Sequence, residues 1–323
     1  MPAGKKALCY IPWIGLLLFA LLCHVSPGLA ALLLDRLTRP ALLALNRWTA
    51  RVPFPLVEPI AFAAVAVALA ALIWALYRRK AAALVSWLKG LAAAAVVVLW
   101  VLALAWLPAM LQPVETPPAP GAAQLEWLCG QLIDGLNSSA LDFPEPAEAL
   151  RLAPETAGLS GCTVKAARYP EWMRGAGISG LFTPPTGEAI VDAGVSPALI
   201  PFTAVHELMH LGGIADEGAA NIAAWERCLA EGGPFADSAR LWALRYALGQ
   251  LNRADEAAWR RVRGNMKDPL TRVFQACGGE VMPRNRFTLV PSFARIGGDY
   301  GDLTGWLAKY SKASPPQREG VAE

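Results

Sequence analysis

Three long apolar stretches near the N-terminus restrict this chain more than any other feature of its sequence. They run from about residue 7 to 34, from 56 to 77 and from 91 to 111. Each is long enough to cross a bilayer as a helix, which takes about 20 apolar residues. The composition of the whole chain is also typical of a membrane protein, since 55% of its residues are hydrophobic and only 17% are charged. We therefore expect a multi-pass protein of the cell membrane that contacts the lipid bilayer.

The first stretch has a second interpretation, a cleaved signal peptide. Lys5 and Lys6 precede a short apolar core, and residues 26–30 offer small side chains for cleavage. The apolar run continues past that point to Leu34, which favours a retained span.

Basic residues predict the orientation. Lys5, Lys6, the cluster at 78–80 and Lys89 would lie in the cytoplasm, which places everything after residue 111 outside it. The link between the first two spans counts against this orientation, because it would place four arginines outside the cytoplasm: Arg36, Arg39, Arg47 and Arg51. The orientation is therefore favoured by six basic residues and opposed by four.

Beyond the third span, residues 112–121 are rich in proline and indicate a stiff linker to a domain at 122–323. Residues 1–114 hold 10 of the 29 basic and 2 of the 26 acidic residues, so the remainder has 19 basic, 24 acidic and a net charge of −5. With no basic patch, we expect no nucleic acid partner. Four cysteines in this part permit two disulfides in any pairing: Cys129, Cys162, Cys228 and Cys277.

Helical periodicity dominates the C-terminal domain, with few strand-like segments. The fold class that we expect is a membrane α-helical N-terminal region followed by a mainly-α (α+β) domain with a small sheet. The strand-like segments lie at 163–169 and 188–192. The expected helices are 122–137, 145–152, 203–212, 216–231, 235–250, 254–264, 268–276 and 301–311.

One short motif in this domain carries chemistry, His-Glu-Leu-Met-His at 206–210. On a helix, positions i and i+4 share one face, so His206 and His210 can bind one metal ion. Glu207 is then placed to take a proton from water that the metal activates, and is not itself a ligand. The alternative interpretation is a helix that carries two histidines without a metal.

Two carboxylates compete for the place of third ligand. The spacing His-Glu-x-x-His-x-x-Gly-x-x-Asp ends at Asp216 and resembles the metzincin metalloproteases. The segment Glu-x-x-Ala-Asn, from Glu217 to Asn221, resembles the Glu-x-x-Ala-Asp helix of the gluzincins, whose glutamate is a ligand and whose trailing acidic residue orients a ligand histidine. We favour Glu217, because nothing after Asp216 supports the metzincin pattern and aspartate is a common helix N-cap.

These motifs, the segment Gly-Leu-Phe-Thr-Pro-Pro-Thr-Gly-Glu at 180–188 and the three apolar stretches resemble a bacterial domain-of-unknown-function family of multi-pass membrane proteins with a gluzincin-like HExxH module. Members of that family usually carry glutamate at position 219 and an aromatic residue at position 222, where this chain has alanine and isoleucine. The resemblance implies a zincin-like metallopeptidase that binds Zn²⁺, with Tyr300 as the catalytic residue that stabilises the oxyanion. The domain holds no third histidine, and the other candidates for this role are Tyr246, Arg240 and Arg245.

We therefore expect a membrane-anchored zinc metallopeptidase whose extracytoplasmic domain hydrolyses a peptide or protein substrate, with zinc on His206, His210 and Glu217 and with Glu207 as general base. The strand at 188–192 would form the edge of the cleft, with Glu188 in it.

Three other functions stay open: an intramembrane protease, a zinc amidase or other hydrolase acting on the cell wall or another non-protein substrate, and a non-enzymatic membrane sensor or scaffold. Against the first, two prolines and the acidic pair after residue 215 indicate that the apolar stretch 193–215 is a buried core helix.

Overall fold

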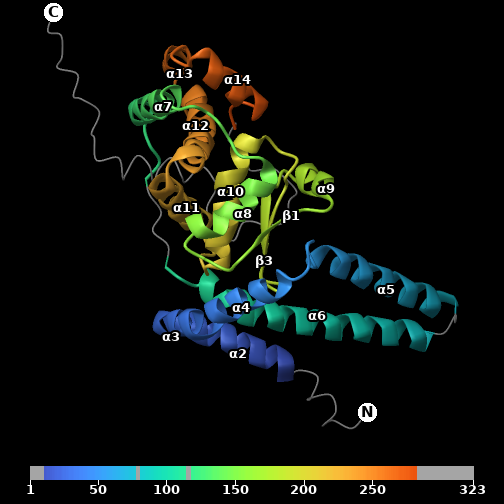
Figure 1. Cartoon of the computed structure of the whole chain (residues 1–323). Coiled ribbons are helices and arrows are strands. Elements are labelled where there is room, and N and C mark those ends of the chain that lie inside the picture. Colours follow the sequence, from blue (N-terminus) through green and yellow to red (C-terminus); the bar gives the residue numbers. More distant parts are fainter. Residues whose placement is uncertain (1–10, 78–80, 114–117, 282–323) are drawn as a thin grey trace, which may run out of the picture.

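The computed structural model describes residues 11–77, 81–113 and 118–281 of the 323-residue chain. The described part is mainly helical and contains a small three-stranded sheet, as the sequence predicts (Figure 1). Tyr300 and the expected helix at 301–311 lie outside the described residues, as does part of the expected linker, residues 114–117.

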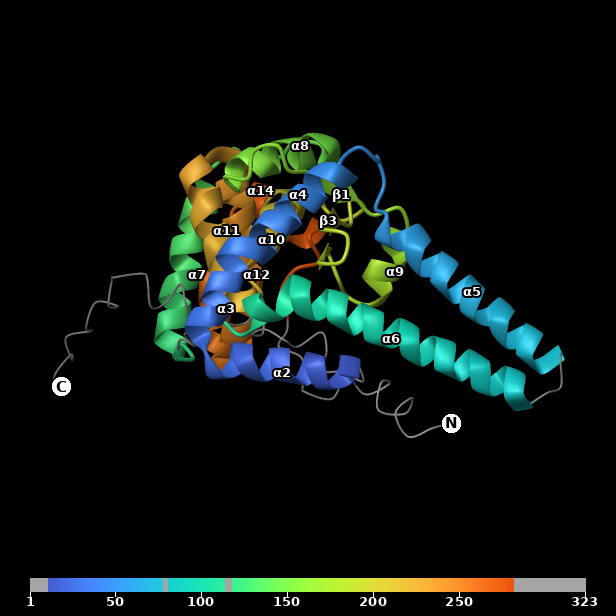
Figure 2. The ribbon, with the colours of Figure 1, turned by 90° about the horizontal axis from the view of Figure 1, so that it is seen from below.

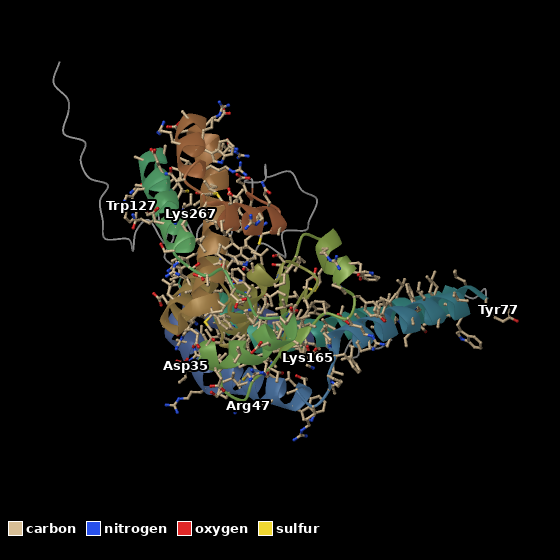
Figure 3. All side chains as sticks on the ribbon, turned by 45° about the horizontal axis from the view of Figure 1, so that its top comes forward. Asp35, Arg47, Tyr77, Trp127, Lys165 and Lys267 are labelled. Atoms are coloured by element: carbon tan, nitrogen blue, oxygen red, sulfur yellow. The ribbon has the colours of Figure 1, made fainter. Side chains whose placement is uncertain are left out.

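Among the described residues, two helices are long and apolar enough to cross a membrane. They are α5 (Val57–Tyr77) and α6 (Ala81–Met110), which form a hairpin that projects from the rest of the molecule (Figures 1 and 2). Side chains point outward along this hairpin, and Tyr77 lies at its far end (Figure 3). The bounds of α5 match the second expected span, whereas α6 begins ten residues before the third expected span because the turns around Lys89 are helical as well.

The first apolar stretch is bent rather than straight. Pro27 has no backbone N–H to continue a helix, and Ser26 caps a new one by accepting a hydrogen bond from the backbone N–H of Leu29 at 3.3 Å. The helices on the two sides of this break meet at 110°, so they would make a third span only as a broken one. The elements of this region are α2 (Ile11–Val25), α3 (Pro27–Leu33), a π-helical turn (Leu34–Thr38) and α4 (Arg39–Thr49).

The C-terminal part follows the helical periodicity of its sequence closely, since most expected helices are present within a few residues of their expected ends. Its helices are α7 (Ala122–Asn137), α8 (Pro146–Thr156), α9 (Pro170–Gly175), a 3₁₀ turn (Pro197–Leu199), α10 (Ile200–Leu211), α11 (Glu217–Glu231), α12 (Gly233–Ala254), α13 (Glu256–Arg263) and α14 (Asp268–Ala276). Its strands are β1 (Val164–Ala166), β2 (Gly180–Thr183) and β3 (Glu188–Val191).

The sheet has the order β1-β3-β2, with β3 parallel to β1 and antiparallel to β2. The expectation that the strand at 188–192 forms a cleft edge is therefore wrong: β3 is central and β2 lies at the edge. Side chains alternate between the faces of a strand, so Gly180 and Phe182 share one face with Ala189 and Val191. Glu188 points to the opposite face.

Glu188 is fully buried there, so its expected place in the cleft is also wrong. Its carboxylate pairs with Lys165 Nζ at 2.6 Å and accepts hydrogen bonds from the backbone N–H groups of Leu56 and Val57 at 2.8 and 3.0 Å. These are the first unpaired donors of α5, and an anion at a helix N-terminus is stabilised. Glu188 therefore attaches the sheet to the start of a candidate membrane span.

Helix α10 lies at the centre of the C-terminal core, and all twelve of its residues are buried, as expected for the apolar stretch around the motif. It packs against α8, α11, α12 and β3. The same core takes in Leu42 of α4 and Trp106 of α6, which precede the expected domain in the sequence. None of the five cysteines in the described part forms a disulfide: Cys23, Cys129, Cys162, Cys228 and Cys277.

Candidate metal centre

The two histidines of α10 and the first residue of α11 converge. His206 Nε2 lies 3.1 Å from His210 Nε2 and 3.1 Å from Glu217 Oε2, and His210 Nε2 lies 3.6 Å from Glu217 Oε1. Both histidines are buried, and Glu217 is partly exposed. Within the described residues this is the one group of three or more metal-ligating side chains with such close donor atoms.

The spacing of these donor atoms fits a zinc ion. Zinc binds histidine nitrogen at 2.0–2.1 Å in tetrahedral geometry, which places neighbouring ligands about 3.3 Å apart. Two imidazole nitrogens and one carboxylate also form the donor set of a hydrolytic zinc site that leaves its fourth position open. The residues present therefore fit the metal that the sequence predicts.

The turn after α10 fixes the ring of His210. Gly213 adopts a positive φ of 93° and so ends the helix, as the Gly-Gly pair predicts. The chain then folds back, and the carbonyl oxygen of Ile214 lies 2.6 Å from His210 Nδ1. Because a carbonyl only accepts hydrogen bonds, Nδ1 carries a proton, and in the neutral ring Nε2 is the nitrogen whose lone pair faces the site. From α4, Arg39 Nε donates to the carbonyl oxygen of Gly212 at 2.7 Å and holds the same turn.

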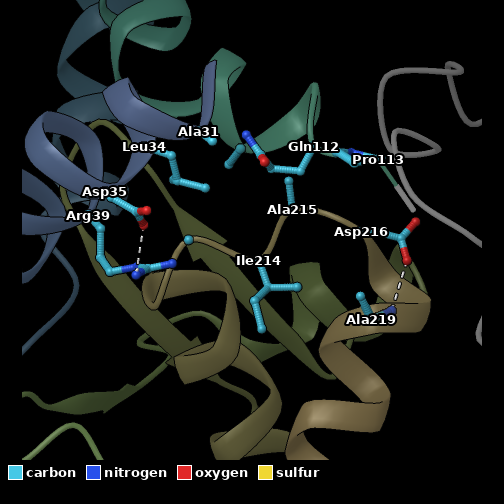
Figure 4. Close-up of a pocket in the computed structure, with 12 residues that line it drawn as sticks. Ala31, Leu34, Asp35, Arg39, Gln112, Pro113, Ile214, Ala215, Asp216 and Ala219 are labelled. Atoms are coloured by element: carbon cyan, nitrogen blue, oxygen red, sulfur yellow. Dashed lines mark hydrogen bonds and ion pairs between the residues drawn. The ribbon is translucent and has the colours of Figure 1, made fainter. Parts of the chain in front are cut away.

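Asp216 and Glu217 take different positions at the start of α11. Asp216 is the N-cap, and its Oδ1 accepts a hydrogen bond from the backbone N–H of Ala219 at 2.8 Å, as expected (Figure 4). Glu217, one residue further, turns toward the histidines. The geometry therefore brings Glu217 to them and leaves Asp216 at the helix end.

Burial and the cluster's own charges shift the pKa values of its members. Burial lowers the pKa of His206, an effect that the hydrogen bonds with Glu217 and Asn221 partly oppose. Burial would also lower the pKa of His210, but the carboxylates of Glu217 and Glu207 outweigh it and raise that pKa to about 9. The two histidines in turn hold the pKa of Glu217 well below its ordinary value, against the effect of burial. Glu217 is thus anionic, and the side chain of the fully buried Asn221 lies beside His206.

Glu207 lies on the same helix as the two histidines and is buried. Burial, reinforced by the negative charge of Glu217, raises the pKa of its carboxyl group to about 8. A carboxyl group whose pKa lies near neutrality can both take up and return a proton, which is what a general base that later acts as an acid requires.

Three residues of this site are not identifiable from the sequence. Phe182 of β2 stacks on His210 with ring centroids 6.5 Å apart, and Trp106 of α6 meets both Phe182, at 5.1 Å, and His210, at 6.2 Å. Gly180 of β2 lies so close to Glu207 that a methyl group at this position would overlap the carboxylate, with Cδ only 2.8 Å away. Gly180 and Phe182 lie on β2 and Trp106 lies on α6, and no spacing in the sequence links these positions to the histidines.

The sequence candidates for oxyanion stabilisation are not gathered at the site within the described residues. Arg240 pairs with Asp237, and Arg245 donates to the carbonyl oxygen of Gly279. Tyr246 stacks on Trp242, which is separated from His206 by the ring of Phe202. Tyr300, the preferred candidate, is not among the described residues.

A cavity of about 280 Å³ lies between the turn after α10 and the helices that precede the hairpin (Figure 4). Its walls include Leu34, Arg39, Ile214 and Asp216, and the salt bridge between Asp35 and Arg39 crosses one side. None of the three candidate ligands lines it, so the cavity is a neighbour of the site and not its substrate cleft.

Comparison with known families identifies one match, which spans most of the chain. The model of a family described as a protein of unknown function (DUF3810) matches residues 40–277. The chain therefore belongs to this family, in agreement with the expected kinship to an uncharacterised family. The match begins in α4 and ends after α14, so it takes in the hairpin as well as His206, His210 and Glu217. No curated protein and no solved structure matches the chain.

Proposed function

We propose that this chain is a membrane-anchored zinc metallopeptidase of the gluzincin type. The observation that carries the proposal is the convergence of His206, His210 and Glu217, with donor atoms 3.1 to 3.6 Å apart, beside the buried Glu207. A structural metal site has no need of a carboxylate that is not a ligand and whose pKa is raised toward neutrality.

His206, His210 and Glu217 would hold the zinc ion. When bound, zinc acts as a Lewis acid that makes water nucleophilic near neutral pH. Glu207 takes the proton from the attacking water at its carboxylate and returns it to the leaving amine. The Nδ1 proton of His210, held on the carbonyl oxygen of Ile214, keeps that ring in the orientation that ligation needs.

The edge strand β2 supports a peptide as the substrate. The backbone N–H of Asp192 donates to the carbonyl oxygen of Ser179, so in this antiparallel pair the N–H and C=O groups of Gly180 and Phe182 point away from β3. An extended peptide can pair with these groups and add a strand to the sheet. Gly180 also touches Glu207, which brings the added strand next to the general base.

Metal content and hydrolysis of the full-length protein in detergent test this proposal. We expect about one zinc per chain, and we expect His206→Ala to lose it. Glu207→Gln should keep the zinc but lower the cleavage rate of a peptide library by about 10³-fold or more. Full zinc content in the His206→Ala variant, or unchanged cleavage by Glu207→Gln, would contradict the assignment.

A further inference from the structure

The metal centre is built against the end of a candidate membrane span. Trp106, whose ring meets His210 and Phe182, lies four residues before the end of α6, which runs unbroken from Ala81. One side of these last turns is buried in the core, at Ala103, Pro108 and Ala109. The other side keeps apolar residues exposed, among them Leu102 and Leu104.

This exposed apolar surface continues onto α2. The indole N–H of Trp100 in α6 donates to the carbonyl oxygen of Pro12, and Phe19 packs on the ring of Trp100 at 6.2 Å. Most large side chains of α2 point outward, including Leu17 and Val25 at 69% and 71% exposure. A contiguous apolar surface of this kind is covered in stable proteins, and lipid is its natural cover next to membrane spans.

A second contact joins α9, which precedes the edge strand β2 in the chain, to α5, the other helix of the hairpin. Tyr169 is the N-cap of α9 and Trp172 lies within it. Both rings pack edge-on against the ring of Phe62, with centroids 5.3 Å apart in each pair, and Phe62 lies within the first two turns of α5. Trp172 is 70% exposed, and the guanidinium of Arg168 lies over the ring of Tyr169. Tyrosine, tryptophan and arginine together are typical of the boundary between lipid and water.

The chain covers only a short distance between Trp172 and the strand that contacts Glu207. The end of α9 at Gly175 and the start of β2 at Gly180 are five Cα steps apart, so at most about 19 Å separates them. Gly180 contacts Glu207 directly. An extended peptide covers such a distance with about six residues.

Building on the proposed peptidase function, we propose that the substrates are membrane-anchored peptides or proteins, cleaved within about ten residues of their anchor. A segment that leaves the bilayer beside the start of α5 reaches β2 in extended form and arrives at Glu207 without crossing open solvent. A soluble peptide must find the same strand by diffusion and lacks the high effective concentration of a tethered segment.

The test uses the full-length protein in liposomes together with model substrates of a defined kind. These are single-span peptides with a randomised 40-residue segment next to the span, and the same segments without a span. We expect the anchored peptides to be cut mainly within about ten residues of the span and the soluble segments to be cut at least tenfold more slowly, as mass spectrometry of the products would show. Cuts spread evenly along the 40 residues, or confined to the half far from the span, would overturn the inference.

Two variants separate this inference from the peptidase proposal. Trp172→Glu changes an exposed side chain outside the catalytic site, so cleavage of soluble segments in detergent should stay the same while cleavage of anchored peptides in liposomes falls several-fold. The matched control is Leu229→Glu on α11, on the opposite side of the molecule from α5, which should change neither rate (Figures 1 and 2). Equal loss in both assays, or no loss in either, would contradict the inference alone. Absence of Glu207-dependent cleavage in every assay would overturn both proposals.

Discussion

At the scale of single residues, two neighbouring carboxylates occupy very different environments. Asp216 bonds to the backbone of α11, whereas Glu217 faces two imidazole nitrogens. The sequence motif places both beside the histidines and favours Glu217 without deciding between them, because the choice depends on how one turn of helix is oriented. The N-cap bond decides it, since it fixes Asp216 and so directs the next side chain inward.

Substitution of these two carboxylates should have opposite effects on metal binding. Glu217→Ala should release zinc because it removes a ligand, with a loss of affinity by orders of magnitude. Asp216→Ala should keep zinc and lose about 1 kcal/mol of stability, the usual cost of removing a helix N-cap. Zinc titration and thermal unfolding of the two proteins measure both effects. The reverse pattern would favour the metzincin-like arrangement.

Gly180 is required by the space that Glu207 occupies. In Gly180→Ala the new methyl group would displace the buried carboxylate, and a misplacement of about 1 Å can cost about 10²-fold in rate. We therefore expect normal zinc content and a large fall in kcat. The matched control is Gly130→Ala in α7, where an added methyl group meets nothing within 4 Å and cleavage should be unchanged. Full activity of Gly180→Ala would place the general base elsewhere.

At the scale of elements, periodicity and capping signals predict the C-terminal helices well. The Gly-Gly stop after α10 and the aspartate before α11 are local signals, and the structure confirms both. The edge strand β2 has no such signal, because glycine begins it and two prolines follow it. The place of α4 in the core also escapes the sequence, since its partners lie more than 100 residues away.

Asn46 of α4 should matter for stability despite its distance from the metal centre in the sequence. Its side chain donates to the carbonyl oxygens of Thr163 and Gly187 and accepts from the N–H of Thr163. Asn46→Ala leaves these buried groups unpaired, so we expect a loss of about 2 to 4 kcal/mol in the free energy of unfolding, seen as a lower Tm. Arg47→Ala removes an exposed contact with Ser160 and a weak contact with the thiol of Cys162, and should change stability by about 0.5 kcal/mol or less. Equal effects of the two changes would argue against this role of α4.

At the scale of the whole molecule, the link between the first apolar stretch and the hairpin packs against the part that holds the candidate metal centre, so a membrane crossed by the hairpin would have both on one side. Arg39 bonds to the turn after α10, and Lys165 Nζ donates to the carbonyl oxygens of Thr49 and Phe54. One of the arginines that oppose the charge rule, Arg39, therefore has a structural role here, because it bonds to the carbonyl oxygen of Gly212. With Arg39 explained, the basic cluster at 78–80 is the stronger indicator of the cytoplasmic side.

A reporter that is active only outside the cytoplasm should therefore work when fused after residue 323. The same reporter inserted after Arg79, between the second and third expected spans, should be inactive, because the proposed orientation puts positions 79 and 323 on opposite sides of the membrane. Activity of a cytoplasm-only reporter at the C-terminus would reverse the proposed orientation, although the link and the metal centre would still share one side.

The bonds of Asn46 also impose an order of events on synthesis of the chain. Helix α4 leaves the ribosome before either helix of the hairpin, yet its partners at Thr163 and Gly187 follow 117 and 141 residues later. Contacts between residues so far apart form late, because the intervening chain must first be ordered. A nascent chain that ends before residue 187 therefore contains α4 but lacks Gly187, one of the residues that Asn46 binds. The histidines come later still, at 206 and 210, so the candidate metal centre cannot assemble until both helices of the hairpin have been synthesised.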